Sequence, residues 1–501
     1  MSSGLAVQMQ DESLLAQLGY KQEFKRDSGV LELTGLVFSI QGVLPGIASV
    51  LVYSIPYGGA VSMVWGWGVC SIFLMFIATA IAELGSAAPT SGGVYYWTFQ
   101  FSSPSCRKYL SWLLGYIDII AYIAGVSIGD VRSRSWQLPV LGPVNLSRQM
   151  SFRPTVAVLQ TVLCSLATRV IAKLQLVYML TLNIGLCVGV IFGMPADTPV
   201  EFKNDARYAF GSFQNSSLWP DGFAFILSFL APLWVVGGFD SSVHVSEEAR
   251  NASTAIPWAI ILSTAISCIL GWAINVSIAF NMGEDIDGIL SNPIGQPLAT
   301  FQSTRNISAL EYNNHCPVHG GHKSYRFLHS VEMACALPFS NTLYHVQGSS
   351  SVPLRCVWAS ASVSILLGLI PLAGNAASGA VFALAVVGQY ICCSTAIMAR
   401  WLWGREFKKG PFHMGVLVRT VTPKFAHIIL FMMLMSVILL FPAEPNLSGP
   451  ATMNYTVLVI GSVIVFSTVY YFLPVYGGMN WFTGPVITAG RDDAITDSKS
   501  A

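Results

Sequence analysis

Ten apolar stretches, each long enough to cross a lipid bilayer as a helix, run through this 501-residue sequence. A membrane-spanning helix needs about 20 consecutive, mostly apolar residues. The ten stretches are 34–55, 61–83, 109–128, 174–194, 222–240, 257–280, 353–373, 377–399, 425–442 and 453–475. An eleventh stretch, 154–168, is apolar but short and ends at Arg169. The sequence therefore predicts an all-α polytopic membrane protein with one compact helical domain.

The overall composition excludes three other classes of protein. Hydrophobic residues make up 53% of the chain and charged residues 10%, whereas a soluble protein carries about 25% charged residues. Disorder requires low hydrophobicity and high charge, and a soluble enzyme of this length could not bury so much apolar surface. With 26 Lys and Arg against 25 Asp and Glu, the chain has no basic excess to neutralise phosphates. We expect it to lie in the lipid bilayer and to bind no nucleic acid.

The spacing of cysteine and histidine predicts no metal site, and we expect no cofactor. The ten cysteines are scattered and form no CxxC pair. His315, His319 and His322, with His329 beyond them, would share one face of a helix, but Pro317 and two glycines argue against a helix there. A membrane-embedded oxidoreductase that uses this cluster is the alternative, although such enzymes need several clusters and the sequence has one.

The distribution of Lys and Arg sets the expected orientation, because cytoplasmic loops carry an excess of both. Cations gather in the N-terminal tail and in three loops: Lys21, Lys25, Arg26, Arg107, Lys108, Arg169, Lys173, Arg400, Arg405, Lys408, Lys409, Arg419 and Lys424. The opposite loops hold Asp197, Glu201, Asp205, Glu284, Asp285, Asp287 and Glu444. We therefore expect a cytoplasmic N-terminal tail at 1–33, a transmembrane domain at 34–475 and a cytoplasmic C-terminal tail at 476–501.

Two polar stretches, 130–153 and 301–336, make the transmembrane domain irregular. The first contains four arginines on the side of the membrane where positive charge is disfavoured. The six cations of 400–424 are cytoplasmic only if the chain crosses the membrane once between 300 and 353. Nothing in that stretch could cross lipid as a helix, so the count of spans lacks one crossing.

The first span carries glycine and proline at mid-membrane depth, in the run Gln41, Gly42, Pro45, Gly46 and Ile47. A broken helix is tolerated within a membrane only where it lines a cavity, because the freed backbone groups need partners. The second half-helix would present N–H groups and a positive dipole end, which can hold a substrate carboxylate. We predict that these residues bind substrate. A proline kink that serves packing alone is the alternative.

The sixth span, if 154–168 is counted as the fourth, has a matching interruption. It contains Trp234, Gly237, Gly238, Phe239 and Asp240. Transporters built from inverted repeats break their first and sixth helices at symmetric positions, so the two interruptions support each other. We predict that Trp234 and Phe239 form walls of the substrate pocket and that the two glycines bring backbone close to the substrate.

Two motifs lie at predicted span ends. The segment 83–97, from Glu83 to Trp97, combines a proline and a glycine pair with trailing aromatics that suit a membrane–water interface. An ordinary interfacial turn is the alternative to a functional role there. Glu247 and Glu248 follow the sixth span, either as part of a capped cytoplasmic helix end or as solvated loop charges.

Three segments resemble the fungal amino acid, GABA and choline permeases of the amino acid–polyamine–organocation superfamily. They are GGFDSSVHVSEEARNASTAIPWAI at 237–260, AELGSAAPTSGGVYYW at 82–97 and YSIPYGGAVSMVWGWG at 53–68. The resemblance covers roughly 30–130, 154–300 and 336–475. It implies a leucine-transporter-like 5+5 inverted repeat of twelve helices, with the fourth clipped and the eighth not recognisable here. Such abrupt loss and recovery of a pattern indicates a mis-spliced or frame-shifted gene model, or a decayed gene.

The resemblance also implies a function. A secondary active transporter of this kind moves a small amino acid, GABA or a choline-like amine across the plasma membrane, and is not an enzyme. We expect coupling to H⁺ rather than Na⁺, because one ion site of sodium-coupled relatives draws on the eighth helix. The alternatives are a transport-dead or sensor-like relative and a transporter of a pathway metabolite.

Two carboxylates are candidates for proton coupling. Asp118 lies in the middle of the third span, where an ionisable residue is a functional hypothesis by default. Asp240 follows the helix break, so we expect it to be better solvated and to act as a helix cap. We therefore favour Asp118. Of seven glycosylation sequons, only those at Asn215 and Asn446 fall in loops placed confidently outside the cell.

Overall fold

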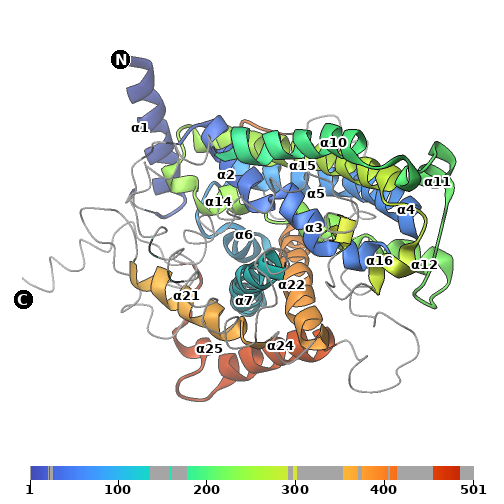
Figure 1. Ribbon diagram of the computed structural model, residues 1–501. Helices are drawn as coiled ribbons and strands as arrows, with labels where there is room; N and C mark the ends of the chain where they lie inside the picture. Colours follow the sequence, from blue (N-terminus) through green and yellow to red (C-terminus); the bar gives the residue numbers. More distant parts are fainter. Residues whose placement is uncertain are drawn as a thin grey trace, which may run out of the picture.

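The all-α fold is confirmed by a computed structural model that describes residues 2–20, 22, 26, 28–135, 158, 162, 178–291, 297–298, 300–301, 354–370, 375–403, 407–413 and 455–485. Every regular element in these ranges is a helix (Figure 1). Two isolated backbone bridges, Ser28 with Ala249 and Tyr57 with Asn215, are the β-type pairings among the described residues.

The helices of the described residues differ widely in length, and several are separated by short interruptions. The α-helices are α1 (Ser2–Gln17), α2 (Val30–Gln41), α3 (Val43–Ser54), α4 (Gly59–Val61), α5 (Trp67–Ala87), α6 (Gly93–Phe101), α7 (Arg107–Ser135), α10 (Gly185–Asp197), α11 (Ala206–Gly211), α12 (Asp221–Leu227), α13 (Leu230–Val235), α14 (Ser241–His244), α15 (Ala252–Asn281), α16 (Ile286–Leu290), α21 (Leu354–Leu367), α22 (Asn375–Leu402), α24 (Thr456–Phe472) and α25 (Gly478–Trp481). The described residues also form two π-helical segments, η1 (Ser62–Gly66) and η2 (Tyr178–Ile184), and two 3-10 turns, η3 (Val200–Phe202) and η4 (Ser246–Glu248).

Most of the predicted spans correspond to apolar helices. Within the described ranges, five helices are long and apolar enough to cross a membrane: Val30–Ser54, Gly59–Ala87, Arg107–Ser127, Ala252–Asn281 and Ala377–Leu402. Four shorter apolar helices, Gly185–Asp197, Asp221–Val235, Trp358–Leu367 and Thr456–Phe472, overlap four more predicted spans. The predicted spans 154–168 (apart from two residues) and 425–442 lie outside the described residues, as do 136–153 and 302–336 of the two polar stretches.

The helices pack as two groups that share a core. In one group α15 packs against α5, α2 and α10 (Figure 1). In the other α22 packs against α7 and α6, and α24 and α21 also pack against α7. The indole of Trp67 on α5 donates a hydrogen bond to the carbonyl oxygen of Cys268 on α15, at 3.0 Å. A Cβ on Gly271 would clash with that indole, so only glycine allows this approach.

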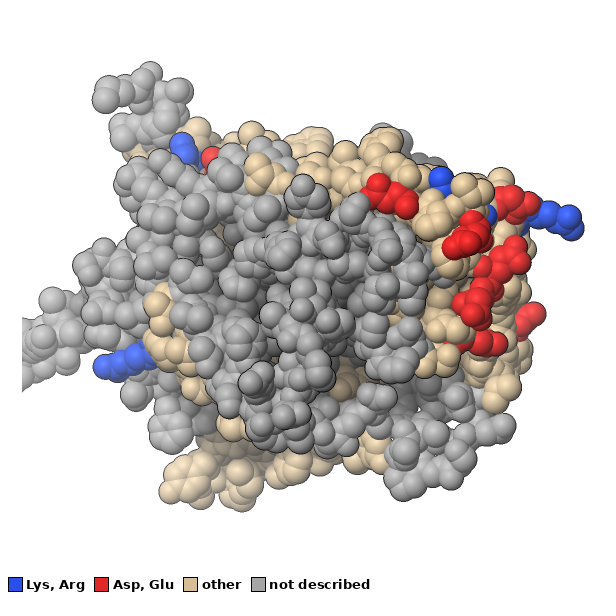
Figure 2. Space-filling view, viewed as in Figure 1, with Lys and Arg blue, Asp and Glu red and all other residues tan. Residues whose placement is uncertain are grey.

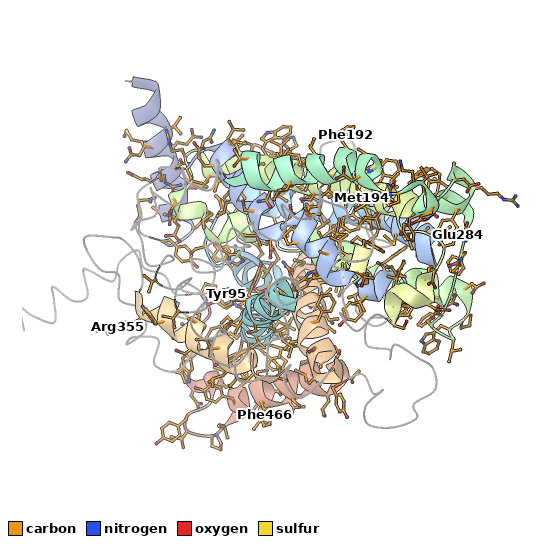
Figure 3. The ribbon with its side chains drawn as sticks, in the orientation of Figure 1. Tyr95, Phe192, Met194, Glu284, Arg355 and Phe466 are labelled. Carbon is orange, nitrogen blue, oxygen red and sulfur yellow. The ribbon has the colours of Figure 1, made fainter. Side chains whose placement is uncertain are left out.

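Apolar side chains cover the outer faces of the bundle as well as its core. On α10 the side chain of Phe192 is 74% exposed, whereas that of Met194 is 1% exposed and packs inward (Figure 3). Phe466 on α24, at the opposite side of the bundle, is 73% exposed (Figure 3). Large apolar groups at such positions are stable in lipid and unfavourable in water, so these faces fit the predicted bilayer.

Acidic residues gather at one end of the molecule, over α11, α12, α16 and the loops beside them (Figure 2). The exposed members are Asp197, Glu201, Asp205, Asp221, Glu284, Asp285 and Asp287. The N-terminus and α1 lie at the opposite end (Figure 1). This separation follows the pattern that the loop charges predict.

Helix α1 is attached to the beginning of α15 through Asp11. Its carboxylate accepts two backbone hydrogen bonds, at 2.7 Å from the N–H of Asn251 and at 3.2 Å from the N–H of Ala252. The first N–H groups of a helix have no acceptor within the helix, and a carboxylate near them also meets the positive end of the helix dipole. Asp11 therefore caps α15 from a distant part of the chain.

A second contact of the N-terminal segment is made by Arg26. Its Nη1 donates to the carbonyl oxygens of Ala249 at 2.7 Å and Ser246 at 3.3 Å, and it lies 3.8 Å from Oδ2 of Asp11. Burial lowers the pKa of the Arg26 guanidinium, and the carboxylates of Asp11 and Glu247 oppose that effect. Arginine remains protonated at any physiological pH. We call Asp11, Arg26 and their bonds the N-terminal latch.

Candidate functional site

The first helix break is a single residue between α2 and α3. Gly42 has φ 49° and ψ 62°, a left-handed conformation that glycine adopts without steric cost. No side-chain hydrogen bond caps α3, and the first N–H groups of any helix have no acceptor within it. The thiol of Cys187 approaches the backbone of Leu44, in the first turn of α3. The break predicted at mid-membrane depth is therefore present, with a helix N-terminus directly beyond it.

The second break separates α13 from α14 and is longer. Five residues, 236–240, connect the two helices, and Gly238 has φ 79°. A Cβ on Gly238 would lie 3.0 Å from Cγ2 of Ile40 on α2, so the left-handed backbone also packs closely on the first break. The carbonyl of Leu233, near the end of α13, accepts a hydrogen bond from the hydroxyl of Tyr390 on α22, at 2.9 Å.

The two breaks are bound directly to each other by Gln41. Its Nε2 donates to the carbonyl oxygen of Val236 at 3.1 Å, and its Oε1 accepts a bond from Ser267 Oγ on α15 at 2.6 Å. A Cβ on Gly46 would lie 3.0 Å from the side chain of Val235. The structure thus brings together the first and second interruptions, which are about 200 residues apart in the sequence.

The residues predicted to bind substrate divide into two kinds. Some retain partial solvent-accessible surface among buried neighbours: Gly42, Pro45, Gly46, Trp234 and Gly237. The others, Gln41, Ile47, Gly238 and Phe239, are buried. The exposed kind could contact a bound molecule through backbone and one indole, whereas the buried kind shapes the breaks behind them.

Aromatic rings adjoin the second break. The ring of Trp234 lies 4.7 Å from that of Phe382 on α22, and Phe382 stacks on Tyr53 of α3 at 5.1 Å between centroids. Phe239 lies deeper, 6.4 Å from Tyr390. Sequence analysis identified Trp234 and Phe239 but missed Phe382 and Tyr53, because nothing in the sequence pairs α3 with α22.

Asp240 occupies a buried polar cluster at the end of the second break. Its Oδ1 accepts hydrogen bonds from the hydroxyl of Tyr122 on α7 at 2.8 Å and from Nε2 of Gln389 on α22 at 2.9 Å. The side chain is 1% exposed and makes no capping bond to α14. The expectation of a better-solvated, helix-capping Asp240 is therefore wrong, because α7 and α22 close over it and supply side-chain donors.

Asp118 lies on α7 one turn before Tyr122 and is fully buried. Both Asp118 and Asp240 act electrostatically on Tyr122 and on Cys393 of α22. The ring of His244 meets that of Tyr122 edge-on, 5.9 Å between centroids. The two candidate carboxylates thus belong to one neighbourhood. The four-residue spacing of Asp118 and Tyr122 was the available signal for it.

The 83–97 segment folds against the protein interior. Tyr95, Tyr96 and Trp97 are 4%, 8% and 0% exposed, so the expected placement of these aromatics at a membrane–water interface is wrong. A Cβ on Gly93 would lie 2.9 Å from the His244 ring, which explains the need for glycine there. The segment therefore packs on α14, and its aromatics fill the core beneath it.

Acidic groups beside this segment are paired. Arg400 at the end of α22 makes two 3.1 Å hydrogen bonds to the carboxylate of Glu83 at the end of α5. Glu247 accepts a bond from Ser91 Oγ at 2.5 Å. Glu247 and Glu248 are 7% and 6% exposed, so the alternative of solvated loop charges is wrong. These contacts join the ends of α5, α22 and η4.

The remaining candidate groups are the two glycosylation sequons and the histidine cluster. Asn215 is half-buried, and its Nδ2 donates to the carbonyl of Trp219 at 2.6 Å and to Asp221 at 2.9 Å. Asn446 and the histidine cluster lie outside the described residues. Within the described ranges, no group of three His, Cys, Asp or Glu side chains is arranged to hold a metal.

Known proteins resemble this chain in sequence and in fold. The GABA-specific permease of Saccharomyces cerevisiae is 31% identical, over 97% of this chain and 88% of its own. An uncharacterised amino-acid permease of Schizosaccharomyces pombe is 33% identical, over 97% and 90%. The manganese transporter of Eremococcus coleocola, in complex with an aromatic bis-isothiourea substituted compound, matches with TM-score 0.52 and 12% identity, over 89% of this chain and 96% of that one. That likeness supports the transporter fold.

The sequence profile of the family described as amino acid permease matches residues 29–310 and 330–464. The matched residues run through the 130–153 stretch and stop across 311–329, inside the second polar stretch. Permeases are membrane transporters rather than enzymes. Because the match covers most of the chain, this multi-pass membrane protein belongs to the amino acid permease family.

Proposed function

We propose that this permease is a proton-coupled secondary transporter of a small amino acid, GABA or a choline-like amine. The observation that supports it most directly is the hydrogen bond between Gln41 and the Val236 carbonyl, which holds two helix breaks together. Helix breaks at mid-membrane depth are how transporters of this architecture bind ions and small charged solutes. The named GABA-specific relative makes GABA the first substrate to test.

In this proposal the first break receives the negative end of the substrate. The N-terminus of α3 presents a positive dipole end, and Gly42, Pro45 and Gly46 beside it retain partial accessible surface. Trp234 forms a wall of the pocket beside Phe382. Gly237 brings backbone to the pocket, and the buried Gln41, Ile47, Gly238 and Phe239 then shape it and hold the breaks together.

Uptake measurements test the proposal. Cells that express the chain should accumulate radiolabelled GABA, alanine or choline above cells that carry the empty vector. Dissipating the proton gradient should abolish accumulation while exchange of external for internal substrate persists. A chain that reaches the surface but transports none of the three would instead be transport-dead or sensor-like, and the proposal would fail.

We also propose a plasma-membrane location with both termini cytoplasmic. The acidic end of the molecule (Figure 2) would then face the outside, and the latch end the cytoplasm. Epitope tags at either terminus and at Lys408 should resist protease added to intact cells. Cleavage of the Lys408 tag from outside would show that 302–352 does not cross the membrane. Removal of an N-glycan by glycosidase should change the mobility of the wild type but not of a chain with both Asn215 and Asn446 replaced by Gln.

A further inference from the structure

The two oxygens of the Asp240 carboxylate differ in their hydrogen bonding. Its Oδ1 accepts two hydrogen bonds, from Tyr122 and from Gln389, whereas Oδ2 has no hydrogen-bond partner among the described residues. The side chain is 1% exposed. Two neutral donors fix the plane of the carboxylate and leave its second oxygen to accept from something else.

A buried carboxylate of this kind needs a positive charge nearby. Burying an ionised group without a partner of opposite charge is strongly unfavourable. In the described part of the chain, ion pairs join Arg26 to Asp11 and Arg400 to Glu83, and neither involves Asp240. With no cationic side chain paired to Asp240 among the described residues, a proton or a cation brought by a bound molecule can supply that charge.

The groups that face Asp240 come from three helices. α7 contributes Tyr122 and, one turn away, Asp118. α22 contributes Gln389 and Cys393, and α14 contributes His244, whose Nδ1 lies 2.9 Å from the Ser91 carbonyl oxygen. None of these side chains is a permanent cation, so the surroundings favour a transient cation.

The cluster also adjoins the proposed substrate position. Gln389 and Gly237 both retain partial accessible surface, and a Cβ on Gly237 would lie 3.0 Å from Oε1 of Gln389. Tyr122 packs on Ile40, two residues before the break at Gly42. Ile40 therefore connects the end of α2, next to the first break, with the tyrosine that binds Asp240.

We propose that Oδ2 of Asp240 binds the positively charged amine of the substrate, with Tyr122 and Gln389 as positioning residues. The inference rests on the proposed function, since it assigns one end of the transported molecule. It assigns different roles to the two carboxylates: Asp240 binds the amine, and Asp118 carries the proton. The substrate class is then a small molecule with an ammonium group, its carboxylate directed to α3.

The test compares a ligand that carries both an amine and a carboxylate with ligands that carry only one of the two groups. Uptake of radiolabelled GABA is measured with n-propylamine, which keeps only the amine, and butyrate, which keeps only the carboxylate, as inhibitors. In Asp240→Asn we expect the half-saturation concentration for GABA to rise about tenfold or more, since a charge-assisted bond is lost. Inhibition by n-propylamine should weaken to the same degree, and inhibition by butyrate should remain as in the wild type. Asp287→Asn, at an exposed carboxylate, is the matched control.

The positioning residues have their own measurement. Tyr122→Phe retains the ring that packs on Ile40 but removes the hydroxyl, and Gln389→Leu removes the amide. Each should raise the half-saturation concentration for GABA about threefold to tenfold without changing inhibition by butyrate. Residues with a purely structural role would instead lower surface abundance and maximal uptake for all ligands alike.

Three outcomes would overturn the inference. Asp240→Asn with unchanged GABA affinity but no accumulation would make Asp240 the coupling carboxylate. Equal weakening of both inhibitors in Asp240→Asn would mean a distorted pocket rather than an amine subsite. A wild-type chain that transports GABA well but is inhibited only by butyrate would have no amine subsite. Failure of the wild type to transport GABA, alanine or choline would instead contradict the proposed function and the subsite together.

Discussion

The break between α2 and α3 occupies one residue, whereas the break between α13 and α14 occupies five. At the first, Gly42 turns the chain and a new helix begins at the next residue. At the second, the unwound segment contains two glycines and ends in a buried carboxylate. The first break thus presents backbone and a helix dipole, and the second presents a side-chain charge.

Their supporting contacts differ in the same way. At the first break the carbonyl of Gly46 accepts a bond from Ser49 within α3 itself, at 2.7 Å, while Gln41 binds the second break and α15. The second break depends on other helices, because Tyr122, Gln389 and Tyr390 come from α7 and α22. A break that is held locally keeps its shape when helices move, whereas one held by neighbours changes with them. We therefore expect the second break to respond to conformational change and the first to remain constant.

The largest effect should come from filling the glycine positions. Gly46→Leu and Gly238→Leu should each reduce GABA uptake on the order of 100-fold, because small displacements at a binding site have effects of that size. Much of the protein should still reach the membrane, as measured by surface labelling. Unchanged affinity in either variant would remove that glycine from the site.

Second-site substitutions separate the two glycines. The atoms nearest to a Cβ on Gly46 all belong to the side chain of Val235, so Val235→Ala should partly restore uptake in Gly46→Leu. Gly238 also has φ 79°, which costs a branched residue about 1–2 kcal/mol whatever the space. Ile40→Ala should therefore fail to restore Gly238→Leu. Equal rescue at both positions would contradict the difference between the breaks.

Replacing Asp118 should affect coupling rather than binding. In Asp118→Asn we expect exchange of external for internal substrate to continue, while accumulation stops at equilibrium with the medium. An asparagine of similar shape cannot bind and release a proton. Asp287→Asn, on the acidic outer surface, is the control and should accumulate normally. If Asp118→Asn still concentrates substrate with normal pH dependence, Asp240 becomes the leading coupling group.

A smaller effect is expected where the two breaks are joined. Gln41→Leu removes bonds to the Val236 carbonyl and to Ser267 Oγ and leaves both partners buried. We expect the half-saturation concentration to rise about tenfold, equivalent to about 1.4 kcal/mol. Gln100→Leu, at an exposed position, serves as the control. Normal affinity in Gln41→Leu would mean that apolar contacts alone hold the breaks together.

We expect the smallest effect from removing one hydroxyl group at each break and comparing the two variants. Tyr390→Phe removes a long-range bond to the Leu233 carbonyl, and Ser49→Ala removes a local bond to the Gly46 carbonyl. Each bond contributes about 1 kcal/mol to stability. In thermal unfolding of the purified protein, bound substrate should offset the loss in Tyr390→Phe but not in Ser49→Ala. Equal behaviour would show that both breaks are equally rigid.

The fold was predictable because its signals are local. Runs of about 20 apolar residues mark the spans, and glycine or proline inside such runs marks the breaks. Gly42 and Gly238, both with positive φ, were identified in this way. The pairing of the two interruptions was predictable from the symmetry of inverted repeats alone.

The polar cluster was not predictable from the same signals. Asp240 is 118 residues from Tyr122 and 149 residues from Gln389, and no periodicity connects them. Its burial was misjudged because hydropathy reports the average of a segment rather than which helices close over one side chain. Glu247 was misjudged for the same reason, since its partner Ser91 lies 156 residues earlier.

The N-terminal latch can form only at a late stage of synthesis and folding. Asp11 and its partner Asn251 are separated by 240 residues, which a ribosome adds in roughly 12–48 seconds at typical rates of synthesis. Throughout that interval the first helix has no docking site, and the beginning of α15 does not yet exist. The latch can close only when the helices between them have been inserted. A closed latch therefore requires that the first half of the bundle has been completed.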